Sequence, residues 1–381
     1  MYKQYYTKFE SETLKQYLTK HSFLSLCYFF LNMTKCYILG AGASQGYSDN
    51  LNGNSIPPGT NEIFSKASQL DLFPQADLYQ RLNNNLELYC QENNQTVDQI
   101  DVEGFLACVA QRFNDLEITT NIQQTNNLLG TLGEMWYLLF ELLKNYSDNY
   151  DANSNNYANL ARHCINDNCA VISLNYDILF ESAILGEGGH FHYPNPTIAN
   201  TSLPICKIHG SVNWLNPSAR GISFGNSTGV RLFRNITQII FSNRINVENP
   251  RIITNLEEMN QLSRNDLVRA GDDYDVPILV PPLGEFKPYD HVQLLIDTWR
   301  AAEQIISESN EIVFIGTSLR QQDERLRNMI ETNVSDDVAF TIVDHHPNER
   351  LDTLRQLLHN DEIDAESFNS FSEYANILST T

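Results

Sequence analysis

Short apolar segments that end in glycine or polar residues recur along this chain, and they constrain its fold more than any other feature. The first segment, Cys36–Leu39, runs directly into the turn Gly40-Ala41-Gly42. Glycine has no Cβ atom, so the backbone can turn sharply there and approach a ligand closely. A buried strand that leads through such a turn into a helix is typical of a nucleotide-binding βα unit. The loop alone also fits a plain tight turn, because the third glycine of the usual G-x-G-x-x-G fingerprint is missing.

Further apolar segments alternate with segments of helical periodicity. We predict additional strands at 169–174, 203–208, 278–280, 311–315 and 338–343. Apolar strands that alternate with helices indicate a parallel sheet covered by helices on both faces. The expected fold class is therefore α/β, with a Rossmann-like, mostly parallel sheet.

Chemically distinctive residues follow directly after five of the predicted strands. They are Gly40–Ser44, Asn175–Asp177, His209–Ser211, Gly316–Ser318 and Asp344. The carboxyl ends of parallel strands lie at one edge of a sheet, and ligands bind at that edge. Turn chemistry would explain one such placement but hardly five, so we expect these residues to form a single site.

A long helical region separates the first two predicted strands. Apolar residues recur at helical spacing between about 60 and 165, and we interpret this region as a helical insertion whose apolar stripe is core. The insertion interrupts an α/β domain expected over 33–360, which a C-terminal segment at 361–381 follows. Residues 1–32 are expected to be an N-terminal extension and a candidate oligomer contact, unless translation begins at Met33.

Charge and cysteine usage exclude several classes of function. The chain of 381 residues has 47 acidic and 25 basic residues, a net charge of -22, which repels nucleic acid and anionic membranes. No segment approaches the length of a membrane span. The seven cysteines are irregularly spaced without a C-x-x-C pair, which favours a reducing cytoplasm. Cys164, Cys169 and the adjacent His163 could be half of a zinc site, but structural thiols are expected, and no metal.

The strand-end motifs resemble the NAD-binding motifs of the sirtuin superfamily, in that family's order. The motifs are G-A-G-A-S at 40–44, L-N-Y-D at 174–177, K-I-H-G-S at 207–211, G-T-S-L at 316–319 and Asp344. The resemblance covers roughly 33–60 and 165–350 and is greatest to the sirtuin-like domains of bacterial anti-phage defence proteins. The chain lacks the paired C-x-x-C zinc module of sirtuins. It keeps only Ile56-Pro57 of their Ile-Pro-Asp-Phe-Arg run, and both departures disfavour protein deacylation.

The resemblance implies an activity and a set of partners. It implies that NAD+ is the substrate and is cleaved to nicotinamide and ADP-ribose, which depletes cellular NAD+ in abortive infection. It also implies a homo-oligomer, in some members of the family paired with a HerA-type ATPase. This chain has no G-x-x-x-x-G-K-[ST] loop, so such an ATPase would be a separate chain. The alternatives are a sensor that binds NAD+ or ADP-ribose without cleaving it, a protein deacylase and, least supported, a nuclease.

Side-chain chemistry and the resemblance together suggest individual roles. Asn175 and His209 are the expected catalytic residues: the amide would hold the attacking water or the ribose hydroxyls, and the imidazole would act as general base. Alternatively, Asn175 or Asp177 caps a helix, His209 belongs to a plain turn, and Asp323 complements a helix dipole. The expected NAD+-binding residues are Gly40, Ala41, Gly42, Ala43, Ser44, Asn175, Asp177, Gly316, Thr317, Ser318 and Asp344.

Overall fold

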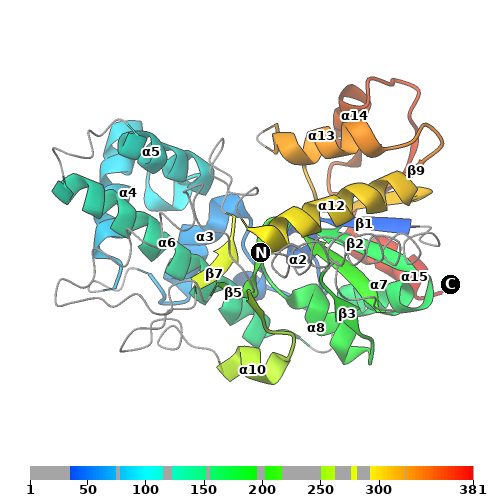
Figure 1. The fold of residues 1–381 in the computed structure, drawn as a ribbon, viewed down its shortest axis with the longest axis horizontal. Coiled ribbons are helices and arrows are strands. Elements are labelled where there is room, and N and C mark those ends of the chain that lie inside the picture. The colour runs from blue at the N-terminus through cyan, green and yellow to red at the C-terminus, as the bar shows by residue number, and fades with distance from the viewer. Residues whose placement is uncertain are drawn as a thin grey trace, which may run out of the picture.

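The described part of the chain contains a parallel sheet of seven strands, which lies in the right-hand part of Figure 1. The computed structural model describes residues 35–73, 78–114, 122–151, 155–194, 202–216, 250–261, 276–280, 292–321 and 323–380. The strands, in spatial order, are β10 (Ala365–Phe368), β9 (Ala339–Val343), β8 (Glu311–Ile315), β1 (Lys35–Leu39), β2 (Cys169–Ser173), β4 (Leu203–Lys207) and β3 (Phe191–His192). Each neighbouring pair is parallel, which confirms the predicted α/β class with a Rossmann-like sheet.

Strand β1 is the central strand, and the direction of the chain across the sheet reverses beside it. From β1 the chain moves outward through β2 to β4, and it later returns to β8 on the other side of β1 and moves outward to β10. Such a reversal opens a crevice beyond the carboxyl ends of the two central strands, where doubly wound sheets bind their ligands. Gly40 and Gly316 directly follow β1 and β8, so both glycine turns lie at this crevice.

Helices cover both faces of this sheet, as its continuous apolar strands require. One face carries α12 (Gln293–Glu308), α13 (Glu324–Asn333) and α14 (Pro347–Leu357), and the other carries α7 (Asn155–Asn166), α8 (Leu179–Gly186) and α15 (Phe371–Leu378) (Figure 1). The sequence did not predict β10, an edge strand with two exposed residues and no apolar run. Residues 365–378 therefore complete the sheet and cover α7, with Asn159 Nδ2 donating to Ala375 O at 3.1 Å.

Most of the long region between β1 and β2, up to the end of α6 (Ile122–Asp148), forms a helical unit with its own core beside the sheet, whereas α7 packs on the sheet itself (Figure 1). Its main helices are α3 (Ile63–Gln69), α4 (Gln80–Asn93), α5 (Val102–Asn114) and α6. The core of this unit includes Phe64, Phe105 and Phe140, none more than 1% exposed. No helix in the described ranges is both long enough and apolar enough to cross a bilayer.

A small antiparallel sheet connects the helical unit to the central sheet. It consists of β6 (Arg251–Ile252), β5 (Gly210–Asn216) and β7 (Val276–Leu279) in that order. Strand β7 overlaps the strand predicted at 278–280, but it pairs antiparallel with β5 outside the central sheet. Strand β5 begins directly after His209 with no crossover helix, so it cannot run parallel beside β4, and β7 pairs with β5 rather than with a strand of the central sheet.

Candidate functional site

The two glycine turns at the crevice bind each other. Gly40 N donates to Ile315 O at 2.9 Å, and Gly42 N donates to Gly316 O at 3.0 Å. A Cβ atom on Gly40 would lie 2.4 Å from Gly316 O, and one on Gly316, whose φ is +58°, would lie 2.3 Å from Ala43 N. The glycines therefore permit close contact between the two turns. The amides of Gly40 and Gly42 are used in this contact, so a phosphate bound here would need other donors.

Ser44 joins the first turn to the loop after β2. This side chain is buried in α2 (Ala41–Gln45), and its Oγ donates to Asp177 Oδ2 at 2.9 Å. Asn175 Nδ2 donates to Ser44 Oγ at 2.9 Å, and the Tyr157 hydroxyl lies 3.1 Å from the same atom. Because the one hydroxyl proton of Ser44 goes to Asp177, Tyr157 must be the donor in the last pair. Burial first, and then the Asp177 charge, raises the pKa of Tyr157, so its proton is retained.

Asn175 is oriented by two acceptors. Its Nδ2 group donates to Gly40 O at 2.8 Å as well as to Ser44 Oγ. A backbone carbonyl can only accept, so this pairing fixes which end of the amide is NH2. The amide oxygen of Asn175 is then the atom left to accept a hydrogen bond from water or a ligand.

Asp177 has a structural role at the start of α8. Its Oδ1 accepts from Leu179 N at 3.1 Å, and its Oδ2 accepts from Ser44. Asp177 thus accepts from the first residue of α8, although Ile178 holds the N-cap position itself, and Asp177 also lines the cavity described below.

His209 follows β4 and faces an acid from the loop after β8. Its Nε2 lies 3.7 Å from Asp323 Oδ1, and its ring centroid lies 6.2 Å from that of Tyr176. The backbone holds this residue in place, since Val280 N donates to His209 O at 2.8 Å. Asp323 precedes α13, as the dipole interpretation expected, but its contact with His209 was not predicted.

These residues line one cavity of about 1040 Å³, counted with its open mouth. Asn175, Asp177 and His209 contribute to its wall, together with an arginine, Arg320, and the acid Asp323. The turn residues that line it are Gly40, Ala41, Ser44, Gly316, Thr317 and Ser318. Gly42, Ala43 and Asp344 do not line it. Asp344 accepts instead from His346 N at 2.9 Å and lies 3.4 Å from Arg350 Nε.

The helical unit supplies an apolar wall that the sequence did not predict. Ile63 of α3 and Leu139 and Leu143 of α6 line the cavity, together with Pro58 and Gly59. An apolar wall beside polar groups from several loops is the usual composition of a small-molecule site. The cavity therefore lies between the strand ends of the sheet and the helical unit.

The cysteines considered for a zinc site lie away from this cavity. Cys164 and Cys169 are buried, and Cys169 begins β2, at the end of the strand opposite to Asn175. The adjacent Cys164 thiol and then His163 lower the pKa of Cys169, while burial opposes this change. Within the residues described, no group of three or more His, Cys, Asp or Glu side chains is arranged to hold a metal ion.

No family model matches this chain, and no curated protein matches it. The function is therefore argued from the geometry of the cavity.

Replacing Ser44 by alanine is expected to destabilise the protein by about 1–3 kcal/mol, because Asp177 and Asn175 each lose a buried partner. Tyr157→Phe is the matched control, since it removes one hydroxyl from the same cluster and leaves the Asn175 and Asp177 bonds in place. The free energy of unfolding from urea titration measures both variants. An equal loss in the two would show that Ser44 does not hold the cluster together.

Proposed function

We propose that this protein is an NAD+ glycohydrolase that cleaves NAD+ to nicotinamide and ADP-ribose. The observation that carries the proposal is that Asn175, His209 and both glycine turns line a single cavity at the strand reversal of a parallel sheet. Doubly wound sheets bind dinucleotides at this position. The order of the strand-end motifs, which resembles that of sirtuin-like domains, supports the choice of NAD+.

The proposed reaction requires few side chains of the protein. NAD+ and water give nicotinamide, ADP-ribose and one proton: the bond from ribose C1′ to the pyridinium nitrogen breaks, and a bond from C1′ to the water oxygen forms. Nicotinamide leaves neutral, and the sugar passes through a state that resembles an oxocarbenium ion. The Asn175 amide oxygen would hold the attacking water or a ribose hydroxyl, and His209 would accept the proton.

The charges of the cavity suit both ends of the substrate. Asp177 and Asp323 bring carboxylates to the wall that carries Asn175 and His209, and they would stabilise positive charge as it develops on the ribose. Arg320 supplies a guanidinium, and the turn at Gly316–Ser318 supplies hydroxyls, which would bind the diphosphate. The apolar residues Ile63 and Leu139 would exclude water from the rest of the ligand.

Asp323→Asn is expected to lower the rate of NAD+ cleavage by about 10- to 100-fold, because it removes the negative charge that lies 3.7 Å from His209 Nε2 in the cavity wall. The initial rate of nicotinamide release at saturating NAD+ measures the effect. Asp167→Asn is the matched control, since Asp167 also faces a histidine, with its Oδ2 2.8 Å from His163 Nδ1, but does not line the cavity, and it should stay within about twofold of wild type. A rate for Asp323→Asn equal to that control would remove Asp323 from the mechanism.

The second candidate is a sensor that binds NAD+ or ADP-ribose without cleaving it. One observation favours it: Ser44 accepts a hydrogen bond from Asn175 and donates one to Asp177, so part of the polar chemistry of the site is used within the protein.

For either candidate we propose a role in anti-phage defence in the cytoplasm. The protein would act as a homo-oligomer, with a HerA-type ATPase on a separate chain as its partner.

The decisive experiment incubates the purified full-length chain with NAD+ and separates nicotinamide from ADP-ribose by chromatography. Binding of NAD+ is followed in parallel by titration calorimetry. Glycohydrolysis predicts equal amounts of the two products, accumulating over many turnovers. Binding without release, at every protein concentration and with the ATPase added, would establish the sensor instead.

A further inference from the structure

Two buried ions lie beneath the cavity without lining it. Lys207, the last residue of β4, and Glu181 of α8 have side chains 1% and 2% exposed, and their Nζ and Oε1 atoms lie 3.2 Å apart. Removing two charges from water is costly, and apolar residues of similar volume often serve stability equally well. The presence of this pair directly below the site therefore calls for a reason other than stability.

The Lys207 ammonium connects the two segments that carry the proposed catalytic residues. It donates a hydrogen bond to the backbone oxygen of Asp177, two residues after Asn175. Lys207 itself lies two residues before His209 on the neighbouring strand. The backbone of the same region is paired on either side, with Ile208 N donating to Ser173 O at 3.2 Å and Val212 N donating to Tyr176 O at 3.0 Å.

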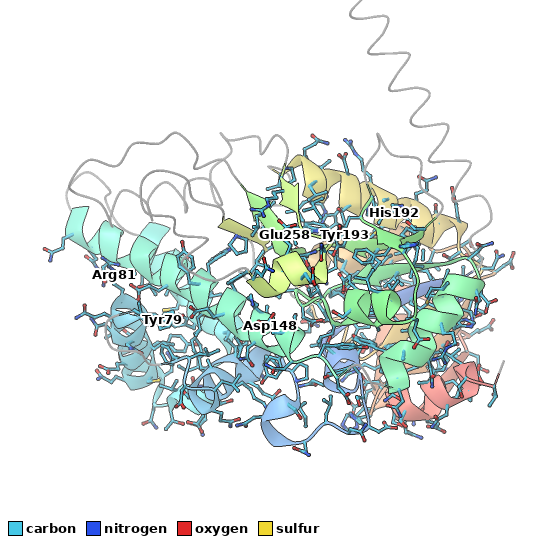
Figure 2. All side chains as sticks on the ribbon, turned by 90° about the horizontal axis from the view of Figure 1, so that it is seen from below. Tyr79, Arg81, Asp148, His192, Tyr193 and Glu258 are labelled. Atoms are coloured by element: carbon cyan, nitrogen blue, oxygen red, sulfur yellow. The ribbon has the colours of Figure 1, made fainter. Side chains whose placement is uncertain are left out.

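Glu181 is held in turn by a buried chain of hydrogen bonds. The Tyr193 hydroxyl donates to Glu181 Oε1 at 3.0 Å, and Asn213 Nδ2 donates to the Tyr193 oxygen at 3.0 Å and to Ile253 O at 2.7 Å. Burial, and then the charge of Glu181, raises the pKa of Tyr193, so the phenol remains a donor. Figure 2 shows Tyr193 among the elements beside the central sheet, away from Tyr79 and Arg81 of the helical unit.

The ring of Tyr193 also packs edge-on against Trp214 of β5, with centroids 5.0 Å apart. The carboxylate that neutralises Lys207 is therefore fixed by Tyr193, which Asn213 and Trp214 of β5 hold in place. The Lys207 ammonium thus has a fixed counter-ion, Glu181, on one side and the Asp177 carbonyl on the other. The position of this ammonium therefore determines the position of the loop at residues 175–177.

We infer that the Lys207–Glu181 pair is a positioning device that sets the distance between Asn175 and His209. The inference rests on the proposed NAD+ cleavage for its effect on rate, although its effect on the loop is independent of any activity. Lys207 and Glu181 are thus positioning residues that act through the backbone of residues 175–177, without contact with the substrate.

The test uses the double variant Lys207→Met/Glu181→Gln in the full-length chain. It removes both charges, so no unpaired ion stays buried, and the glutamine oxygen can still accept from Tyr193. Two quantities are measured: hydrogen–deuterium exchange of peptides covering residues 174–179, and kcat and KM for nicotinamide release. We expect the variant to fold, exchange in 174–179 to accelerate at least tenfold, and kcat to fall at least tenfold while KM changes less than threefold.

The matched control is Lys35→Met/Glu311→Gln, which removes an ion pair of 2.9 Å between the first residues of β1 and β8, at the end of these strands opposite to the cavity. It should leave exchange in 174–179 and kcat unchanged. A folded Lys207/Glu181 double variant with wild-type exchange in 174–179, or with wild-type kcat, would overturn the inference. If the wild type binds NAD+ but releases no nicotinamide while exchange accelerates in the double variant, NAD+ cleavage fails and the positioning of the loop stands.

Discussion

Replacing His209 by alanine is expected to reduce NAD+ cleavage by about 10²- to 10⁴-fold, the usual contribution of a general acid–base side chain. The imidazole lies in the cavity wall with Asp323 as its neighbour, and among the described residues that line the cavity His209 is the only histidine. Because the backbone oxygen of His209 makes the bond to Val280, the alanine variant keeps that bond and should fold. The measurement is the initial rate of nicotinamide release at saturating NAD+.

His192→Ala is the matched control for this prediction. His192 is a partly buried histidine of β3 whose Nδ1 lies 3.2 Å from Ser202 Oγ, and it does not line the cavity. Its loss should leave the rate within about twofold of wild type. If His209→Ala were as active as His192→Ala, the proposed site would be wrong even if the protein cleaved NAD+.

The second large effect is expected from Gly316→Ala, which should destabilise the protein by about 3–5 kcal/mol. Two costs add at this position: a φ of +58° that L-residues rarely adopt, and a Cβ 2.3 Å from Ala43 N. Relief of the clash would separate the two turns and move the cavity wall. Thermal unfolding should show a Tm lower by about 5–10 °C, and nicotinamide release should be lost with it.

Two other glycines separate these costs. Gly188 also has a positive φ, +76°, but no atom lies within 4 Å of its Cβ position, so Gly188→Ala should cost only about 1 kcal/mol. Gly186, at the end of α8, has neither constraint, and alanine there should be neutral or stabilising by up to about 1 kcal/mol. Equal losses at Gly316 and Gly188 would show that backbone strain, not contact between the turns, explains the glycine.

Much of the sheet could be predicted because buried parallel strands carry continuous apolar runs. The segments 36–39, 169–174 and 311–315 show this pattern, and each has polar or glycine residues where the chain leaves the core. Because the strands run parallel, the residues that follow them lie together at one end of the sheet, as the structure shows for Asn175, His209 and Gly316. The identity of the reaction does not follow from this arrangement, and it remains a proposal.

Other features depend on contacts between segments distant in sequence. The edge strand β10 has exposed residues at Glu366 and Ser367, so no apolar run marks it. Asp323 directly precedes helix α13, where acidic residues are common, so the sequence does not single it out. Only the folded structure shows that it lies beside His209. Leu139 lines the cavity from helix α6. From the sequence, the apolar stripe of this helix indicates only a buried core. Asp344 fits a ribose-binding position by sequence, but its carboxylate contacts Arg350 outside the cavity.

The most direct test of the central claim compares nicotinamide release by the wild type and by Asn175→Ala, using full-length protein at a saturating concentration of NAD+. Binding of NAD+ to both proteins is measured in the same buffer, so that a loss of rate can be separated from a loss of binding. We predict that both proteins bind NAD+ and that only the wild type releases nicotinamide and ADP-ribose in equal amounts. Release by Asn175→Ala at the wild-type rate, or no binding of NAD+ to either protein, would contradict the account.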